Sequence, residues 1–108
     1  MNREIPFLER FRDALLEGRK TATSRYQRLA EPGDRFQAFG AVFRVTAVQK
    51  ETVAHVAEWL WLREGVDSRE EFLEIWRQLH PRRPEPLEDE VWVHDFLLET
   101  PPTPEALL

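Results

Sequence analysis

The segment Gly18–Arg25, with the sequence GRKTATSR, gathers side chains that can carry out acid–base and nucleophilic chemistry. The chain contains thirteen arginines but only two lysines, Lys20 and Lys50. A lysine that is removed from water can lose its proton and act as a base, whereas an arginine stays protonated. We therefore interpret Lys20 as a candidate proton acceptor.

Three hydroxyl side chains, Thr21, Thr23 and Ser24, follow this lysine. A hydroxyl group becomes a useful nucleophile when a neighbouring base removes its proton. In a regular strand Lys20 and Thr23 would point to opposite faces, because side chains alternate with a period of two. If both serve one pocket, we expect the backbone between them to turn or bulge. Thr21 and Ser24 are interpreted as strand and turn residues that support the fold.

Glu64 supplies a carboxylate from a distant part of the chain, directly before Gly65. A simpler interpretation is that Lys20 and Glu64 form a surface ion pair, which would contribute little to stability. Glu64 alone also suits a solvated helix end. These residues by themselves do not distinguish a functional Lys20–Glu64 pair from two surface side chains.

The histidines and two tryptophans are further candidates. His55, His80 and His94 have no metal-binding spacing, so no metal site is expected. A catalytic pair of His94 with Asp95 is disfavoured, because adjacent strand residues point to opposite faces. Trp59 and Trp61 lie two residues apart and cannot both occupy the centre of one helix face. We expect the more exposed of the two to be the better platform for stacking on a base.

The composition is that of one folded domain. The chain has 108 residues, of which 42% are hydrophobic and 12 are aromatic, enough for a single core. There is no cysteine, which excludes disulfides and thiolate metal sites, and no cofactor is expected. No apolar run is long enough to cross a bilayer, and the N-terminal residues are charged. We therefore expect a cytoplasmic protein that does not enter membranes.

The net charge of −5 argues against tight binding of long nucleic acids. The charge is unevenly distributed, however. Residues 1–50 hold ten basic and six acidic side chains, a balance of +4, whereas residues 51–108 hold five and fourteen, a balance of −9. The basic half suits a phosphate group or a short RNA.

Hydrophobic periodicity and turn residues predict a small α+β domain in which a curved sheet is closed or is covered by helices. Helices are predicted at 6–17, at 53–63 after a Thr52 cap, and from Ser68, which begins a capping box, to about His80. Strands are predicted at 35–39, 42–48 and 91–98, with a Pro-Gly-Asp turn at 32–34. We expect one domain, residues 1–100, followed by a proline-rich tail, residues 101–108.

Three of these features occur together in an order that resembles the ASCH domain family. The first is a G-x-K-x-x-x-x-R element at Gly18, Lys20 and Arg25. The second is a Pro-Gly-Asp turn with an alternating strand at 32–39. The third is a Glu-Gly-x-x-Ser segment at Glu64, Gly65 and Ser68, which leads into a helix. With the closing strand VWVHDF, the resemblance covers about residues 5–98. It implies a PUA-like curved sheet or barrel with flanking helices and an RNA-related role.

Within that family, the chain is most similar to short bacterial members, some of which remove the acyl group from N4-acetylcytidine and related N4-acylcytosines. This resemblance implies Lys20 as proton acceptor, Thr23 as nucleophile and Glu64 as proton donor. Arg25 would bind the ligand. Position 24 departs from the pattern, because Ser24 stands where these amidohydrolases often have an apolar residue.

Two alternatives remain open for the same cleft. One is a non-catalytic RNA-binding module that uses the basic N-terminal half and an exposed tryptophan. The other is a ribonuclease. The expected partner is accordingly a modified nucleoside or a short RNA, and the oligomeric state is left open.

Overall fold

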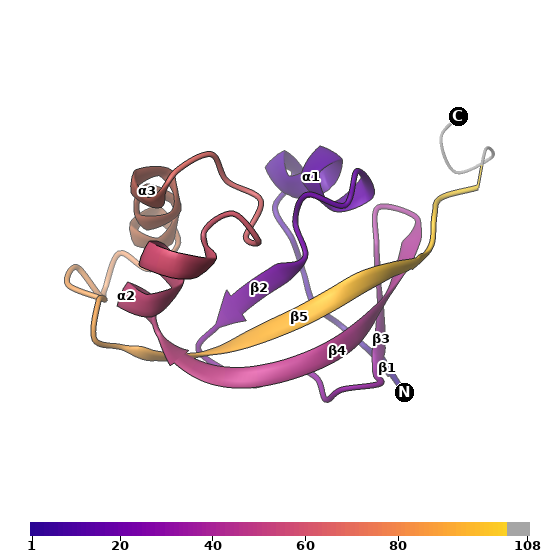
Figure 1. Ribbon diagram of the computed structural model, residues 1–108, viewed down its shortest axis with the longest axis horizontal. Coiled ribbons are helices and arrows are strands. Elements are labelled where there is room, and N and C mark those ends of the chain that lie inside the picture. Colours follow the sequence, from indigo (N-terminus) through magenta and orange to yellow (C-terminus); the bar gives the residue numbers. More distant parts are fainter. Residues whose placement is uncertain (104–108) are drawn as a thin grey trace.

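A strongly bent, five-stranded sheet organises the fold (Figure 1). The computed structural model describes residues 1–103. In their order across the sheet, the strands are β1 (Asn2–Arg3), β3 (Arg35–Ala38), β4 (Ala41–Thr52), β5 (Glu90–Thr100) and β2 (Ala22–Arg25). Neighbouring strands are antiparallel, except that β1 runs parallel to β3. The edge strands β1 and β2 do not pair with each other, so the sheet is curved but does not close into a barrel.

Short helices lie on one side of the long β4–β5 pair (Figure 1). They are α1 (Arg12–Leu16), α2 (Val53–His55) and α3 (Arg69–Leu79). A 3-10 turn (Glu9–Phe11) precedes α1, and a π-helical segment (Val56–Leu60) continues α2. The α+β class with a curved sheet and flanking helices is thus confirmed. No helix among residues 1–103 is long and apolar enough to span a membrane.

The β3–β4 hairpin and the bend of β4 follow from local sequence. Gly33 in the predicted turn and Gly40 in the hairpin loop have φ angles of 93° and 80°, which glycine adopts without a steric penalty. The pairing of β4 with β5 shifts register between Val42 and Phe43 and again between Val45 and Ala47. Such irregularities bend and twist strands, and here they accompany the bowl shape that receives the helices.

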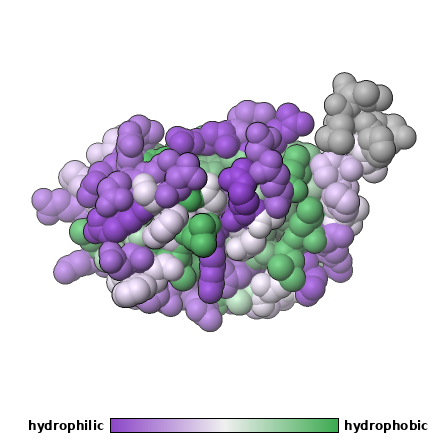
Figure 2. Space-filling view, turned by 45° about the horizontal axis from the view of Figure 1, so that its top comes forward, coloured by the Kyte–Doolittle hydropathy of each residue, from purple (hydrophilic) through white to green (hydrophobic). Residues whose placement is uncertain are grey.

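Two hydrophobic clusters fill the molecule. The first lies among α2, α3 and one half of the sheet, with Val56, Phe72, Trp76, Val91 and Val93 among its buried residues. The second packs α1 and the N-terminal segment against the other half, with Leu15, Phe36, Phe43, Val45 and Phe96 among its buried residues. Phe11 contacts both clusters. Figure 2 shows mainly hydrophilic side chains outside them, with hydrophobic residues reaching the surface in separate groups.

Two helix predictions need correction. The helix predicted at 6–17 begins only at the turn starting at Glu9, because Leu8 is extended and Pro6 uses its carbonyl oxygen to accept a hydrogen bond from Arg25. The helix predicted at 53–63 is interrupted by the π-helical segment, a feature that often occurs at functional sites. The caps at Thr52 and Ser68 are confirmed, since each hydroxyl accepts a hydrogen bond from the backbone N–H three residues later. Of the predicted tail, residues 104–108 lie outside the described residues.

Candidate active site

A pocket of about 380 Å³ lies beside the edge strand β2, where the two hydrophobic clusters meet. The N-terminal segment forms one wall, with Pro6, Phe7, Leu8 and Phe11. The opposite wall comes mainly from α3 and its flanks, with Val66, Phe72, Ile75, Trp76, Leu79 and His80. The polar side chains of the pocket are Lys20, Thr23, Ser24, Arg25 and Glu64. The structure thus gathers four residues singled out by the sequence, together with Ser24.

Lys20 and Glu64 form a buried pair. Their exposed fractions are 4% and 5%, so the interpretation as a surface ion pair is wrong. The Lys20 Nζ atom donates a hydrogen bond to the backbone oxygen of Glu64 at 2.7 Å and lies 3.5 Å from its carboxylate Oε1. Burial lowers the pKa of Lys20, although the negative charge of Glu64 opposes this effect. The arrangement therefore favours the neutral amine more than water does.

The end of α1 delivers Lys20 to this position. Gly18 has a φ of 76° and ends the helix, with its N–H bonded to Leu15 O and the N–H of Arg19 bonded to Ala14 O. This is the Schellman pattern. The N–H of Lys20 also donates to Ala14 O, so its backbone is fixed before β2 begins. Because Lys20 lies before the strand, the alternation of strand side chains does not determine whether Lys20 and Thr23 point the same way.

Gly65 allows Glu64 to approach Lys20 closely. A Cβ atom at position 65 would lie 2.7 Å from the Cβ of Lys20 and 3.3 Å from the Cβ of Ala14, and the φ of Gly65 is 82°. Both the space and the backbone conformation therefore require glycine. The carbonyl of the preceding Arg63 accepts hydrogen bonds from the N–H groups of Thr21 and Ala22. The Glu-Gly pair is thus attached directly to the lysine segment.

Arg25 holds the Thr23 hydroxyl. Its Nε donates to Thr23 Oγ1 at 3.1 Å, its Nη2 donates to the backbone oxygen of Pro6 at 2.5 Å, and its guanidinium lies 5.2 Å from the centre of the Phe7 ring. Burial lowers the pKa of Arg25. Because the Thr23 oxygen accepts a hydrogen bond from Arg25, its own hydroxyl proton remains available for a base.

Ser24 is a site residue that the sequence interpretation assigned only to the scaffold. Its Oγ donates a hydrogen bond to Glu64 Oε2 at 2.8 Å, and its exposed fraction is 5%. Thr23 and Ser24 are adjacent in the edge strand β2, and both line the pocket. The signal in the sequence was the polar residue at a position where an apolar one was expected. Thr21, by contrast, does not line the pocket.

The tryptophans proposed to stack on a ligand lie elsewhere. Trp59 is 73% exposed, and Trp61 packs partly buried against the first hydrophobic cluster. Neither lines the pocket, whose aromatic walls are instead formed by Phe7, Phe11, Phe72 and Trp76. Trp76 lies on the apolar side of α3 and is buried, and it also lines the pocket. Periodicity identifies such a residue as core and gives no sign of this second role.

His94 has a structural role. Its side chain is fully buried, its Nε2 accepts a hydrogen bond from the N–H of Leu29 at 3.0 Å, and its Nδ1 lies 3.3 Å from the backbone oxygen of Thr23. These contacts fit a neutral ring with the proton on Nδ1. Burial is the main cause that lowers the pKa of His94, and the charges of Arg25 and Arg28 add to it. No group of three or more His, Asp or Glu residues within 1–103 is arranged to hold a metal ion.

The state of His94 predicts a loss of stability in mild acid. Because the pKa of His94 is lower in the fold than its ordinary value of about 6.5, the unfolded chain binds the extra proton as the pH falls below that value. The free energy of unfolding should therefore decrease between pH 7.5 and pH 5.5, by at most about 1.4 kcal/mol per pH unit for one group. Urea unfolding at both pH values measures this change.

A His94→Gln variant separates this effect from that of His80, whose pKa is also lowered by burial. The variant should be less stable than the wild type at pH 7.5 but should lose less stability on acidification. An identical pH dependence in both proteins would refute the assignment of a buried neutral His94.

The comparisons with known proteins agree with this fold. Comparison with protein-family models and with curated protein sequences gives no match. Among solved structures, hypothetical protein PH0355 is similar with a TM-score of 0.71 and 19% identity, over 92% of this chain and 100% of that one. Protein EF3133 from Enterococcus faecalis V583 is similar with a TM-score of 0.61 and 23% identity, over 84% of this chain and 71% of that one.

An ASCH domain from Lactobacillus crispatus JV V101 is also similar, with a TM-score of 0.63 and 19% identity, over 80% of this chain and 68% of that one. The chain therefore has the fold of an ASCH domain, as the sequence resemblance implied. At these identities, the likeness concerns the fold, and the chemistry of the pocket is argued from its own residues.

Proposed function

We propose that the pocket hydrolyses the N4-acyl amide of N4-acetylcytidine or of a closely related modified pyrimidine nucleoside. The observation that carries this proposal is the buried Lys20–Glu64 pair, which lines the same pocket as the Thr23 hydroxyl. A base, a nucleophile and a carboxyl group are the parts that amide hydrolysis requires. The ASCH-domain fold adds support for an RNA-related ligand.

The walls of the pocket suit a pyrimidine. Phe7, Phe11, Phe72 and Trp76 offer apolar and aromatic surface to a flat ring, and the polar groups gather at one part of the lining. The volume of about 380 Å³ lies within the range of about 300–1,000 Å³ typical of small-molecule sites. A single modified base or nucleoside fits these dimensions better than a folded RNA surface does.

The proposed reaction assigns one role to each polar residue. Neutral Lys20 takes the hydroxyl proton of Thr23, and the Thr23 oxygen attacks the acyl carbon. Protonated Lys20 passes this proton to the nearby Glu64 carboxylate, and Glu64 gives it to N4 as the carbon–nitrogen bond breaks, which releases cytidine and leaves an ester on Thr23. A water molecule then gives a proton to neutral Lys20 as its oxygen bonds to the ester carbon. Lys20 passes that proton to the Thr23 oxygen as the ester bond breaks, which releases the free acid and restores all three side chains. Arg25 orients Thr23 by donating to its oxygen.

The test is the release of cytidine from N4-acetylcytidine by the purified chain, followed by chromatography. The wild type should release cytidine, a Thr23→Ala variant should show at least a hundredfold lower rate, and a Thr21→Ala variant should retain activity. Thr21 is a matched control because it belongs to the same segment but does not line the pocket. If the wild type binds cytidine but releases none from the acetylated compound, the pocket is a binding module and the proposed reaction is wrong.

Ser24 provides a separate prediction. Its hydrogen bond holds one oxygen of Glu64, so Ser24→Ala frees that oxygen to rotate and leaves it without a buried donor. We expect kcat to fall about tenfold and stability to fall by about 1–3 kcal/mol, which is the usual penalty for an unsatisfied buried group. Ser24→Thr keeps the hydroxyl and should recover most of the kcat. Steady-state kinetics with both variants decide this, and equal rates for Ser24→Ala and the wild type would rule out the positioning role.

A further inference from the structure

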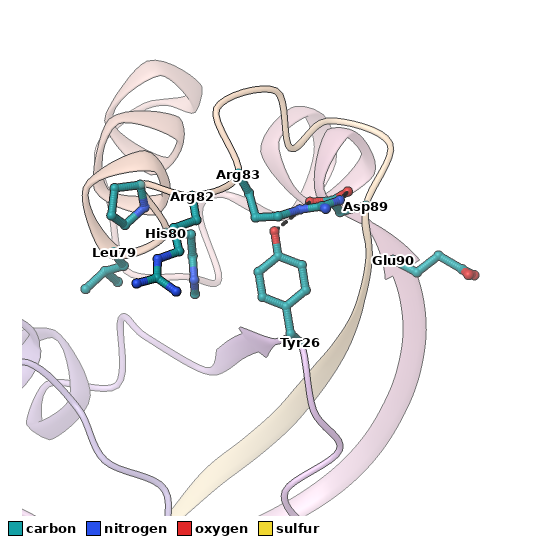
Figure 3. A pocket seen from close by; sticks show the side chains of 8 residues that line it. Tyr26, Leu79, His80, Arg82, Arg83, Asp89 and Glu90 are labelled. Atoms are coloured by element: carbon teal, nitrogen blue, oxygen red, sulfur yellow. Dashed lines mark hydrogen bonds and ion pairs between the residues drawn. The ribbon is translucent and has the colours of Figure 1, made fainter.

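A second cavity, of about 560 Å³, adjoins the candidate active site at the end of α3 (Figure 3). The two cavities share Leu79 and His80 in their linings. Of the other residues of the second cavity, Tyr26 directly follows β2 and Glu90 begins β5. The remaining ones lie in the loop between α3 and β5: Pro81, Arg82, Arg83 and Asp89. The two cavities are therefore neighbours that meet at Leu79 and His80.

His80 is the fixed part of this shared lining. Its ring centre lies 4.5 Å from that of Trp76, which lines the first pocket, and 4.9 Å from that of Tyr26, which lines the second. The Tyr26 hydroxyl donates to Asp89 at 2.7 Å and lies 3.3 Å from the Trp76 Nε1 donor. Burial and the charge of Arg25 lower the pKa of His80, which favours its neutral form. The junction is thus a rigid aromatic group.

Two cations, Arg25 and Arg82, flank this junction, and neither forms an ion pair with the described residues, although the negative charge of Glu64 acts on Arg25. Among residues 1–103, neither Arg25 nor Arg82 has a carboxylate oxygen within 4.0 Å. Arg83, by contrast, is paired with Asp89. In Figure 3 the guanidinium of Arg82 lies beside His80, whereas Glu90 points away from it. The side of the second cavity nearest the first pocket is therefore positive, and its acidic residues lie on the other side.

We propose that this side of the second cavity binds the phosphate group of a nucleotide whose base occupies the first pocket. This inference rests on the proposed function and defines its substrate class as a phosphorylated nucleoside, free or within a short RNA. A guanidinium binds phosphate oxygens through charge-assisted, paired hydrogen bonds. Arg82 supplies that group, Arg25 adds positive charge from the other side of His80, and the imidazole offers a neutral donor. The local charge explains how a chain of net charge −5 accepts an anion.

The experiment is isothermal titration with unmodified ligands, which requires no turnover. Cytidine, its 5′-monophosphate, its 3′-monophosphate and inorganic phosphate are titrated into the wild type, an Arg82→Ala variant and an Arg77→Ala variant. Arg77 is a matched control, because it is an exposed arginine of α3 that lines neither cavity. All titrations are repeated at higher salt.

We expect one of the two monophosphates to bind the wild type about tenfold or more tightly than cytidine. This gain should shrink at higher salt and in Arg82→Ala, and it should persist in Arg77→Ala. Inorganic phosphate should bind more weakly than that nucleotide. The inference is overturned if neither monophosphate binds more tightly than cytidine, if Arg82→Ala keeps the full gain, or if inorganic phosphate binds as tightly as the nucleotides.

The outcomes also separate this inference from the proposed function. Release of cytidine from N4-acetylcytidine without a phosphate-dependent gain in affinity refutes only the phosphate site. A phosphate-dependent gain without hydrolysis of any acetylated compound refutes only the reaction. In the latter case, the two cavities together form a nucleotide-binding site.

Discussion

Replacement of Lys20 by methionine should reduce the release of cytidine from N4-acetylcytidine roughly a thousandfold, within the range that a positioned general base contributes. Methionine is similar in length to the lysine stem but has no amine, so Thr23 keeps its alcohol proton. In the wild type, the rate should increase with pH as Lys20 loses its proton, and the rise should begin below the ordinary pKa of lysine because burial lowers the pKa of Lys20. Steady-state rates across a pH series measure both effects.

The interpretation of Lys20→Met requires control of folding. Removing one member of a buried ion pair leaves the other charge without its partner, at a cost of about 3–5 kcal/mol. A Lys20→Met/Glu64→Gln double variant removes both charges and should be more stable than the single variant. Arg19→Ala alters the exposed neighbouring cation and should leave the rate unchanged. If the single variant is folded and as active as the wild type, Lys20 is not the base.

The second large effect is expected for Gly65→Ala. The added methyl group would lie 2.7 Å from the Cβ of Lys20, and the backbone there has a φ of 82°. The left-handed conformation costs a non-glycine residue about 1–2 kcal/mol, and overpacking adds about 1–3 kcal/mol. We therefore expect a loss of about 2–5 kcal/mol in the free energy of unfolding, together with loss of activity because Glu64 and Lys20 are pushed apart. Urea unfolding and the cytidine assay measure these two changes.

Gly18→Ala is the matched control for this prediction. Gly18 has a similar φ of 76°, but no atom lies within 4 Å of the position of an added Cβ. Its substitution should therefore cost only the backbone term, about 1–2 kcal/mol. Equal losses of stability in the two variants would show that close contact with Lys20 is not what requires glycine at position 65.

The sequence was sufficient to predict the parts of the fold that depend on local signals. The end of the predicted 6–17 helix and the Ser68 helix cap are set by hydrogen bonds within a few residues. The α+β class followed from the order of these elements. Local signals did not predict the conformation of the first residues of the expected 6–17 helix, because Pro6 and Phe7 make contacts with Arg25, which is distant in sequence. Such tertiary contacts override local helical periodicity.

The candidate site was only partly accessible to sequence reasoning. Lys20, Thr23, Arg25 and Glu64 were identified by residue type and by family resemblance, and the structure brings them to one pocket. The burial of Lys20 could not be read from the sequence, because it depends on how Gly65 packs against it. The assignment of a stacking role to Trp59 and Trp61 considered only exposure on a helix. The rings that line the pocket instead come from two clusters that meet only in three dimensions.

The proposed active site is tested most directly by the rate of cytidine release from N4-acetylcytidine by the wild type and by the Lys20→Met/Glu64→Gln variant, with unfolding curves for both. We expect that the wild type turns over the substrate and that the double variant, still folded, does so no faster than buffer alone. No product from the folded wild type, or an undiminished rate in the double variant, would contradict an active site built on the buried Lys20–Glu64 pair.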